Sequence, residues 1–234
     1  MSGSFWPALV FALSVTLPSI LLLALGYFLR RSGQVDARFC YQASKIVFRY
    51  SLPALLFFSI YGNKVDFGSQ IPLIAAGAVA SLTLFVGPEL IAARTRMAAT
   101  DKGVFVQGVS RANTMIAGLA FIANAYGAEG VAVGAVYGGA MTLLYNVLAV
   151  ITLNQNVSSS RRVQAGYFAK QLLTNPLIVA ILLALAAKAV ALPVSPLLVQ
   201  TGGYLSAVAL PLAMSCAGTT LNVQSLFSVS SIAL

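Results

Sequence analysis

The chain has 234 residues, of which 59% are apolar and 8% are charged, and its mean hydropathy is +0.89. A soluble domain carries about 25% charged residues, so this composition excludes an ordinary soluble fold. The net charge of +9 falls in short segments between apolar runs, which is typical of membrane topology signals and argues against a nucleic-acid partner. There is no His, and Cys40 and Cys216 lack metal-ligand spacing. The sequence therefore predicts no metal site, no cofactor and no disulfide framework.

Apolar runs long enough to cross a bilayer, which takes about 20 residues in a helix, follow one another along the chain. The first run has no basic leading segment and is followed by Arg30 and Arg31, so it is predicted to be a retained span and not a cleaved signal peptide. The seven predicted spans, numbered 1 to 7, cover residues 7–29, 39–62, 71–93, 103–126, 130–153, 172–192 and 197–221.

Basic residues concentrate after the odd-numbered spans, while the opposite ends hold only Lys64 and Lys188. Because loops rich in Lys and Arg stay in the cytoplasm, we expect a multi-pass protein with its N-terminus outside. The short loops favour a bacterial inner membrane. The basic residues that set this orientation are Arg30, Arg31, Arg38, Arg94, Arg96, Lys102, Arg161, Arg162 and Lys170.

Proline spacing indicates an internal repeat. Pro18 and Pro53 lie 35 residues apart, Pro176 and Pro211 also lie 35 apart, and the two pairs are offset by 158 residues. A unit of five spans has an odd number of crossings, so its second copy would insert upside down, as in many secondary transporters. We therefore expect a first repeat at 1–153, a cytoplasmic linker at 154–171 and the first two spans of a truncated inverted repeat at 172–234, or seven of ten spans.

Span 4 differs from the other spans because polar residues cluster in its interior. Arg111 lies eight residues in from Gly103, roughly 12 Å deep in a helix, and a cation at that depth costs at least ~2.5 kcal/mol. In one interpretation the cluster faces the transport path and binds an anion, since a guanidinium fits a carboxylate. In the other, Arg111 extends to the cytoplasmic headgroups and its neighbours join helices. The cluster consists of Ser110, Arg111, Asn113 and Thr114.

Glycine and proline mark the places where the helices are expected to break or bend. Gly108 and Gly118 flank the polar cluster, and a break there would expose backbone groups to a ligand. A proline inside a span removes one helical hydrogen bond. The predicted proline hinges are Pro18, Pro53, Pro176 and Pro211.

Two further polar residues lie inside spans, and each has two interpretations. Glu89 of span 3 is predicted either to form an interfacial ion pair with Arg94 or Arg96, or to carry a coupling proton. Asn146 of span 5 is predicted either to hydrogen-bond to span 4 or to contact the substrate.

In these residues the chain resembles the auxin efflux carrier family of membrane transporters, in particular its bacterial malate- and malonate-permease-like members. The matching stretches cover nearly the whole chain, and their order and spacing make the resemblance specific. They are Leu17-Pro18 to Gly33, Val47-Phe48 to Leu52-Pro53-Ala54-Leu55, Gln107-Gly108 through Arg111-Ala112-Asn113 to Gly118-Leu119, and Tyr145-Asn146-Val147 to Val150 together with Asn175-Pro176-Leu177 and Leu210-Pro211-Leu212-Ala213.

The resemblance implies an all-α integral membrane protein of ten spans, built from two inverted five-helix repeats. Broken spans 4 and 9 would cross near the membrane centre and form the substrate site, and spans 1, 2, 6 and 7 would form a scaffold against which the others move like an elevator. It also implies that Asn113 contacts the substrate. The family often has a proline after the Gly-Leu pair of span 4, where this chain has Ala120, so its break is expected to rest on glycine or to be softer.

The sequence thus predicts a secondary transporter for a small organic anion, a carboxylate or dicarboxylate, working by alternating access. Proton coupling, sodium coupling and potential-driven uniport are all open as its energy source, and a flat scaffold surface would favour a homodimer. A membrane-embedded ligand sensor with the same site but no flux is the alternative. An enzyme is not expected, because residues for acid-base or nucleophilic chemistry are lacking.

Overall fold

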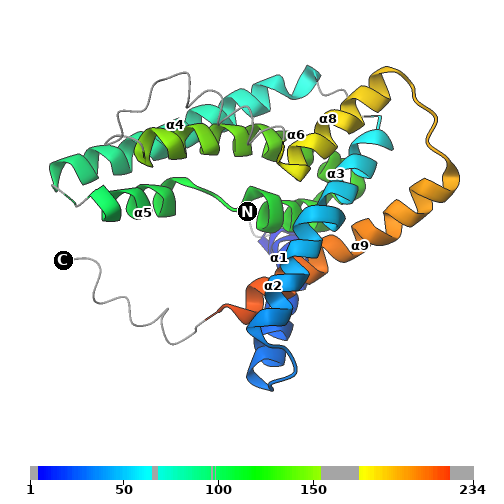
Figure 1. Cartoon of the computed structure of the whole chain (residues 1–234), viewed down its shortest axis with the longest axis horizontal. Helices are drawn as coiled ribbons and strands as arrows, with labels where there is room; N and C mark the ends of the chain where they lie inside the picture. The colour runs from blue at the N-terminus through cyan, green and yellow to red at the C-terminus, as the bar shows by residue number, and fades with distance from the viewer. Residues whose placement is uncertain (1–4, 65–67, 96, 98, 154–173, 222–234) are drawn as a thin grey trace.

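The computed structural model describes residues 5–64, 68–95, 97, 99–153 and 174–221 (Figure 1). All regular elements in these residues are helical. They are α1 (Phe5–Arg31), α2 (Ala37–Ile46), the π-helical η1 (Val47–Ser51), α3 (Leu52–Tyr61), the short 3-10 turn η2 (Gly68–Gln70), α4 (Ile71–Arg94), α5 (Ala99–Ser110), the π-helical η3 (Thr114–Gly118), α6 (Leu119–Leu153), α8 (Pro176–Ala189) and α9 (Pro196–Thr219).

The predicted spans map onto these helices, with one correction. Spans 4 and 5 are the two helical arms of α6, and they meet at Gly127, where the backbone leaves helical geometry (φ 61°, ψ −151°) in a region open to glycine. Span 6 is shorter than predicted, since α8 has 14 residues and Pro176 starts it instead of lying inside it. Five helical segments of the described part are long and apolar enough to cross a membrane. The predicted linker 154–171, residues 222–234, and Arg96, Arg161, Arg162 and Lys170 lie outside the described residues.

Local sequence sets the helix starts. Asp36, Asn175 and Ser195 each precede a helix in extended backbone, and each side-chain oxygen accepts a hydrogen bond from a first-turn backbone N–H. Proline follows Asn175 and Ser195 at the position where its missing N–H costs least. In span 2, the π-helical η1 lies just before Pro53, which cannot donate the next backbone bond.

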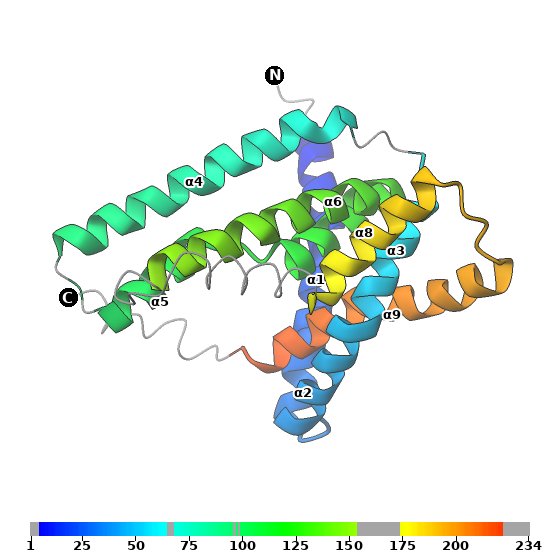
Figure 2. The same cartoon turned by 45° about the horizontal axis from the view of Figure 1, so that its top comes forward.

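The helices form two groups (Figure 2). The α9 group contains α1, α2, η1, α3, α8 and α9, and its most extensive contacts join α1 to α9 and α3 to α8. Gly26 of α1 lies against the backbone of Ser215, and Gly218 of α9 lies against the backbone of Leu23, so a Cβ at either glycine would collide with main-chain atoms. Small residues of this kind let two helices approach to backbone contact.

The α6 group contains α4, α5, η3 and α6, which run side by side in both views (Figures 1 and 2). The two groups meet where α6 touches α1, α3 and α8. One apolar core crosses this junction, with buried side chains from span 2, the span 4 break and α8, namely Val47, Leu52, Leu56, Ile60, Met115, Leu119, Leu177, Ile181 and Ala184.

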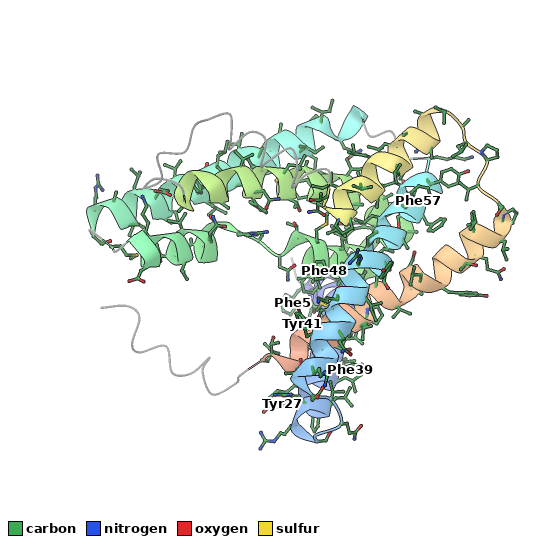
Figure 3. All side chains as sticks on the ribbon, viewed as in Figure 1. Phe5, Tyr27, Phe39, Tyr41, Phe48 and Phe57 are labelled. Atoms are coloured by element: carbon green, nitrogen blue, oxygen red, sulfur yellow. The ribbon has the colours of Figure 1, made fainter. Side chains whose placement is uncertain are left out.

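The outer surface is apolar, as a bilayer requires. Phe5, Phe39 and Tyr41 are each more than half exposed (Figure 3), and many other large apolar side chains of α1, α4 and α9 are equally uncovered. Cys40 and Cys216 are buried together between α2 and α9 as free thiols, and Thr219 donates a hydrogen bond to the Cys40 sulfur at 3.2 Å. They pack as small, soft side chains.

Candidate functional site

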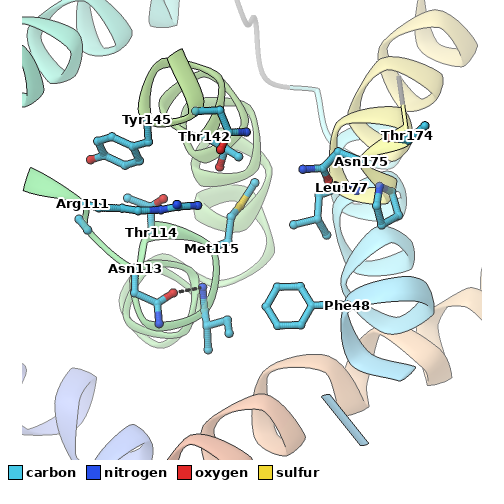
Figure 4. A pocket seen from close by; sticks show the side chains of 14 residues that line it. Phe48, Arg111, Asn113, Thr114, Met115, Thr142, Tyr145, Thr174, Asn175 and Leu177 are labelled. Carbon is cyan, nitrogen blue, oxygen red and sulfur yellow. Dashed lines mark hydrogen bonds between the residues drawn. The ribbon is translucent and has the colours of Figure 1, made fainter. Parts of the chain in front are cut away.

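A cavity of about 650 Å³ lies where the two groups meet, and we call it the central cavity. One wall is the break of span 4, a second is the span 5 arm of α6, and the third belongs to the α9 group (Figure 4). Its lining residues are Phe48, Arg111, Ala112, Asn113, Thr114, Met115, Ile116, Thr142, Tyr145, Asn146, Thr174, Asn175, Pro176 and Leu177.

The break of span 4 results from three residues that leave helical geometry. Helix α5 ends as the Ser110 hydroxyl donates to the Val106 carbonyl at 2.6 Å. Asn113 has φ −83° and ψ 70°, and its Oδ1 accepts a hydrogen bond from the Ile116 N–H at 3.3 Å, which starts the chain turning again. Gly118 N–H then donates to the Asn113 carbonyl at 3.1 Å and closes a π turn. The predicted break is present, and it lies between Gly108 and Gly118.

Among the lining residues that the structure describes, Arg111 is the charged one. Its side chain is exposed and extends from the break toward the middle of the cavity (Figure 4). It makes no hydrogen bond or ion pair with another side chain in the part of the chain that the structure describes. A guanidinium carries five donors, so this group has its full binding capacity available.

The wall formed by α6 supplies neutral polar groups. Tyr145 and Asn146 follow Thr142 by three and four residues, which places both next to Thr142 on the helix surface. The Tyr145 hydroxyl accepts a bond from Ser81 of α4 at 3.3 Å, so its own proton remains for another acceptor. Thr142 is bonded to the Gly138 carbonyl at 2.7 Å.

The wall formed by the α9 group is Phe48 of η1 and the start of α8 (Figure 4). Asn175 precedes Pro176 and caps α8 by accepting a hydrogen bond from the Leu177 N–H at 3.0 Å. We did not predict Phe48, Thr142, Tyr145 or Asn175 as site residues. Helical spacing from Asn146 could have found Thr142 and Tyr145, whereas nothing local in the sequence marks Phe48 or Asn175.

Four of the five predicted binding residues therefore line one cavity: Arg111, Asn113, Thr114 and Asn146. Ser110 does not line it, because its hydroxyl is buried and bonded within α5. Gly108 lies in α5 with open space around it. Of the predicted proline hinges, Pro18 and Pro211 lie inside α1 and α9, Pro53 starts α3 behind η1, and Pro176 starts α8 at the cavity.

Glu89 lies within the α6 group and is not part of the cavity lining. Its Oε2 is 2.7 Å from the Lys102 ammonium of α5, and its Oε1 accepts a hydrogen bond from Thr152 of α6 at 2.8 Å. The ion pair is thus made with Lys102 and not with Arg94; Arg96 lies outside the described residues. Lys102 lies beside Glu89 because α5 packs against α4.

The chemistry of the cavity favours an anion. Its lining holds a guanidinium, hydroxyls and amides, and no Asp or Glu occurs among the lining residues described by the structure. Donor groups held at a break between helices are suited to a carboxylate, whose four lone-pair sites accept several hydrogen bonds at once.

In a comparison with known families, the model of the Mem_trans family, described as "Membrane transport protein", matches residues 11–159. This region contains α1 from residue 11 onward, all helices from α2 to α6, and the break of span 4. Comparisons with curated proteins and with solved structures gave no match.

Proposed function

The chain belongs to this family of membrane transport proteins, the auxin efflux carrier family, and from that premise we propose that it is a secondary transporter for a small organic anion. The observation that carries the proposal is the Arg111 guanidinium, which extends into a cavity at a broken helix with no acidic side chain in its described lining. A cation held there without a side-chain partner among the described residues is suited to an anionic ligand.

Within this site, Arg111 would form a forked pair of bonds with a carboxylate. Asn113, Thr114 and Asn146 would orient the anion, each from a position on the cavity wall. Ser110 would act indirectly, because its bond to the Val106 carbonyl defines where α5 ends and Arg111 begins. The prolines and Gly118 would let the helix ends adjust around the substrate.

Elevator-type alternating access is the mechanism we infer. Two helix groups meet at the central cavity, and each has its own internal contacts: glycine-mediated backbone packing in the α9 group, and the Glu89–Lys102 pair in the α6 group. A substrate bound at the break of span 4 would travel with the α6 group, while the α9 group serves as the scaffold.

The inverted repeat remains part of this proposal, and helix boundaries support it. Arg31 and Ala189, the last residues of α1 and α8, are 158 residues apart. Tyr61 and Thr219, the last residues of α3 and α9, have the same separation. The contacts α1 with α9 and α3 with α8 would then be equivalent, as two copies of one span pair require.

The family and the apolar helices support a multi-pass membrane protein. Three further features are proposals that rest on the sequence pattern. They are an inner membrane with the N-terminus outside, a scaffold-mediated homodimer, and proton or sodium coupling. A sensor that binds the same anion without flux is the second candidate, because the site alone does not require movement of the two groups. Flux separates the two.

The test is uptake of radiolabelled succinate into proteoliposomes that contain the purified protein, with Arg111→Ala and Asn113→Ala variants. We expect saturable uptake that falls by at least about tenfold in both variants, since each removes bonds to a charged group. Arg38→Ala is the control, because Arg38 is an exposed cation of α2 away from the cavity. Binding without uptake would favour the sensor, and uptake unchanged in both variants would refute the site.

A further inference from the structure

Asn175 is held in a defined orientation by the helix that it caps. The Leu177 backbone N–H is a donor, so the Asn175 atom 3.0 Å from it must be the carbonyl oxygen Oδ1. With Oδ1 engaged at the start of α8, the amide nitrogen Nδ2 is the end that points toward the cavity (Figure 4). Asn175 therefore presents the N–H donors of Nδ2 to the cavity, while its Oδ1 is engaged at the start of α8.

Asn113 repeats this arrangement on the opposite wall. Its Oδ1 accepts from the Ile116 N–H at 3.3 Å, which again leaves Nδ2 as the uncommitted end (Figure 4). Arg111 lies on the same side as Asn113 and adds further donors. Donor groups thus face the central cavity from both sides: the Arg111 guanidinium from the α6 group and the Asn175 Nδ2 from the α9 group (Figure 4).

We propose that Asn175 is a specificity-determining residue of this site, whose Nδ2 binds the end of the substrate opposite to the end held by Arg111 and Asn113. The inference rests on the proposed function and deepens it. A substrate bound in this way needs hydrogen-bond acceptors at both ends, so the site would select an anion with two acidic or otherwise acceptor-bearing ends over one with an apolar tail.

A purely structural role makes a different prediction for the same residue. Capping uses only the side-chain oxygen, and Asp and Ser cap helices about as well as Asn. An added negative charge at a helix start is favourable in itself. If Asn175 did nothing but cap α8, Asn175→Asp would be neutral for ligand binding, whereas in the proposed role it replaces a donor by a negative acceptor beside the substrate.

The experiment is equilibrium binding of succinate and of butyrate, which has the same chain length and one carboxylate, to the purified protein by calorimetry. We expect Asn175→Asp to weaken succinate binding by about tenfold or more, the loss typical of a hydrogen bond to a charged group, and butyrate binding by less than about threefold. Asn175→Ser should weaken succinate binding by a smaller factor, because it removes the donor without adding charge. Ser195→Asp is the matched control, since it adds the same charge to the cap of α9 outside the cavity.

Three results would overturn the inference, and they are distinguishable. Wild-type affinities for both anions in Asn175→Asp would leave Asn175 as a cap only. Equal weakening of both anions, with the helix content and the thermal unfolding midpoint unchanged, would mean that Asn175 does not discriminate between substrate ends. Wild-type protein that binds neither anion would refute the proposed function and this inference with it.

Discussion

Helix α1 meets α9 and α6 through two different kinds of contact. Against α9, Gly26 touches the backbone of Ser215, and the reverse contact is made by Gly218 with Leu23. Against α6, the Asn124 side-chain amide donates to the Val15 carbonyl at 2.9 Å and to the Ser19 hydroxyl at 3.3 Å. The first contact joins backbones within one group, and the second joins the two groups through one side chain.

The difference indicates which interface is permanent. A close-packed backbone contact has no room for sliding, because any displacement along it brings a larger side chain against main-chain atoms. A side-chain hydrogen bond is worth about 0.5–1.5 kcal/mol net and can be exchanged for another partner. The α9 group therefore has the properties of a fixed body, and the junction at α6 has those of a surface that can change its contacts.

Placing a side chain in the backbone contact between α1 and α9 should have the largest effect on stability. Gly218→Val would place a side chain into the Leu23 carbonyl, and overpacking of this kind costs about 1–3 kcal/mol or more. We expect the thermal unfolding midpoint in detergent to fall by roughly 3–10 °C. Gly203→Val, on the same helix with no atom near the added Cβ, should leave the midpoint nearly unchanged. Equal midpoints for both variants would show that the α1–α9 contact is loose.

Breaking the Glu89–Lys102 ion pair of the α6 group should have the next largest effect on stability. Glu89→Gln and Lys102→Met each remove one partner of the 2.7 Å pair, whose side chains are 16% and 17% exposed. Each change should cost about 1–3 kcal/mol and lower the unfolding midpoint. The double variant should recover part of the loss, because it removes both charges together.

Transport by the double variant distinguishes the two interpretations of Glu89. If Glu89 only holds α4, α5 and α6 together, uptake driven by a pH gradient should persist in a stable double variant. Loss of the dependence on the pH gradient, with binding intact, would assign the coupling proton to Glu89 and contradict the structural role.

The arrangement of spans could be predicted from the sequence, because hydropathy and bilayer thickness fix helix length almost independently of packing. The break of span 4 could be predicted too, though from glycine. The structure forms it at Arg111–Asn113, where the Asn113 side chain caps the next turn. The separation of spans 4 and 5 could be predicted as well, because three polar or small residues lie between two apolar runs, and the backbone leaves helical geometry at Gly127, the first of the three.

The site could be predicted only where its residues are unusual for their own span. A deep Arg111 is costly wherever it lies, so composition alone points to it. Asn175 has an ordinary local explanation, since Asn followed by Pro is a common helix start. Its place in the cavity depends on the packing of α8 against α3 and α6, contacts between residues far apart in sequence.

Removing the Asn124 contact between α1 and α6 should have the smallest effect on stability. Its specific effect should be on the movement of the two helix groups relative to each other. Asn124→Ala deletes two hydrogen bonds between the groups. A net loss near 1 kcal/mol corresponds to a change of about fivefold in the equilibrium between contact and separation. We expect faster amide hydrogen exchange in peptides covering residues 119–126, with an unfolding midpoint within about 2 °C of wild type. Gln200→Ala is the control, because the Gln200–Tyr204 bond lies within α9 and does not join the groups. Unchanged exchange in Asn124→Ala would mean that apolar packing between α6 and α1 and α3 holds this interface. In that case the movement we infer would have to occur across a different surface.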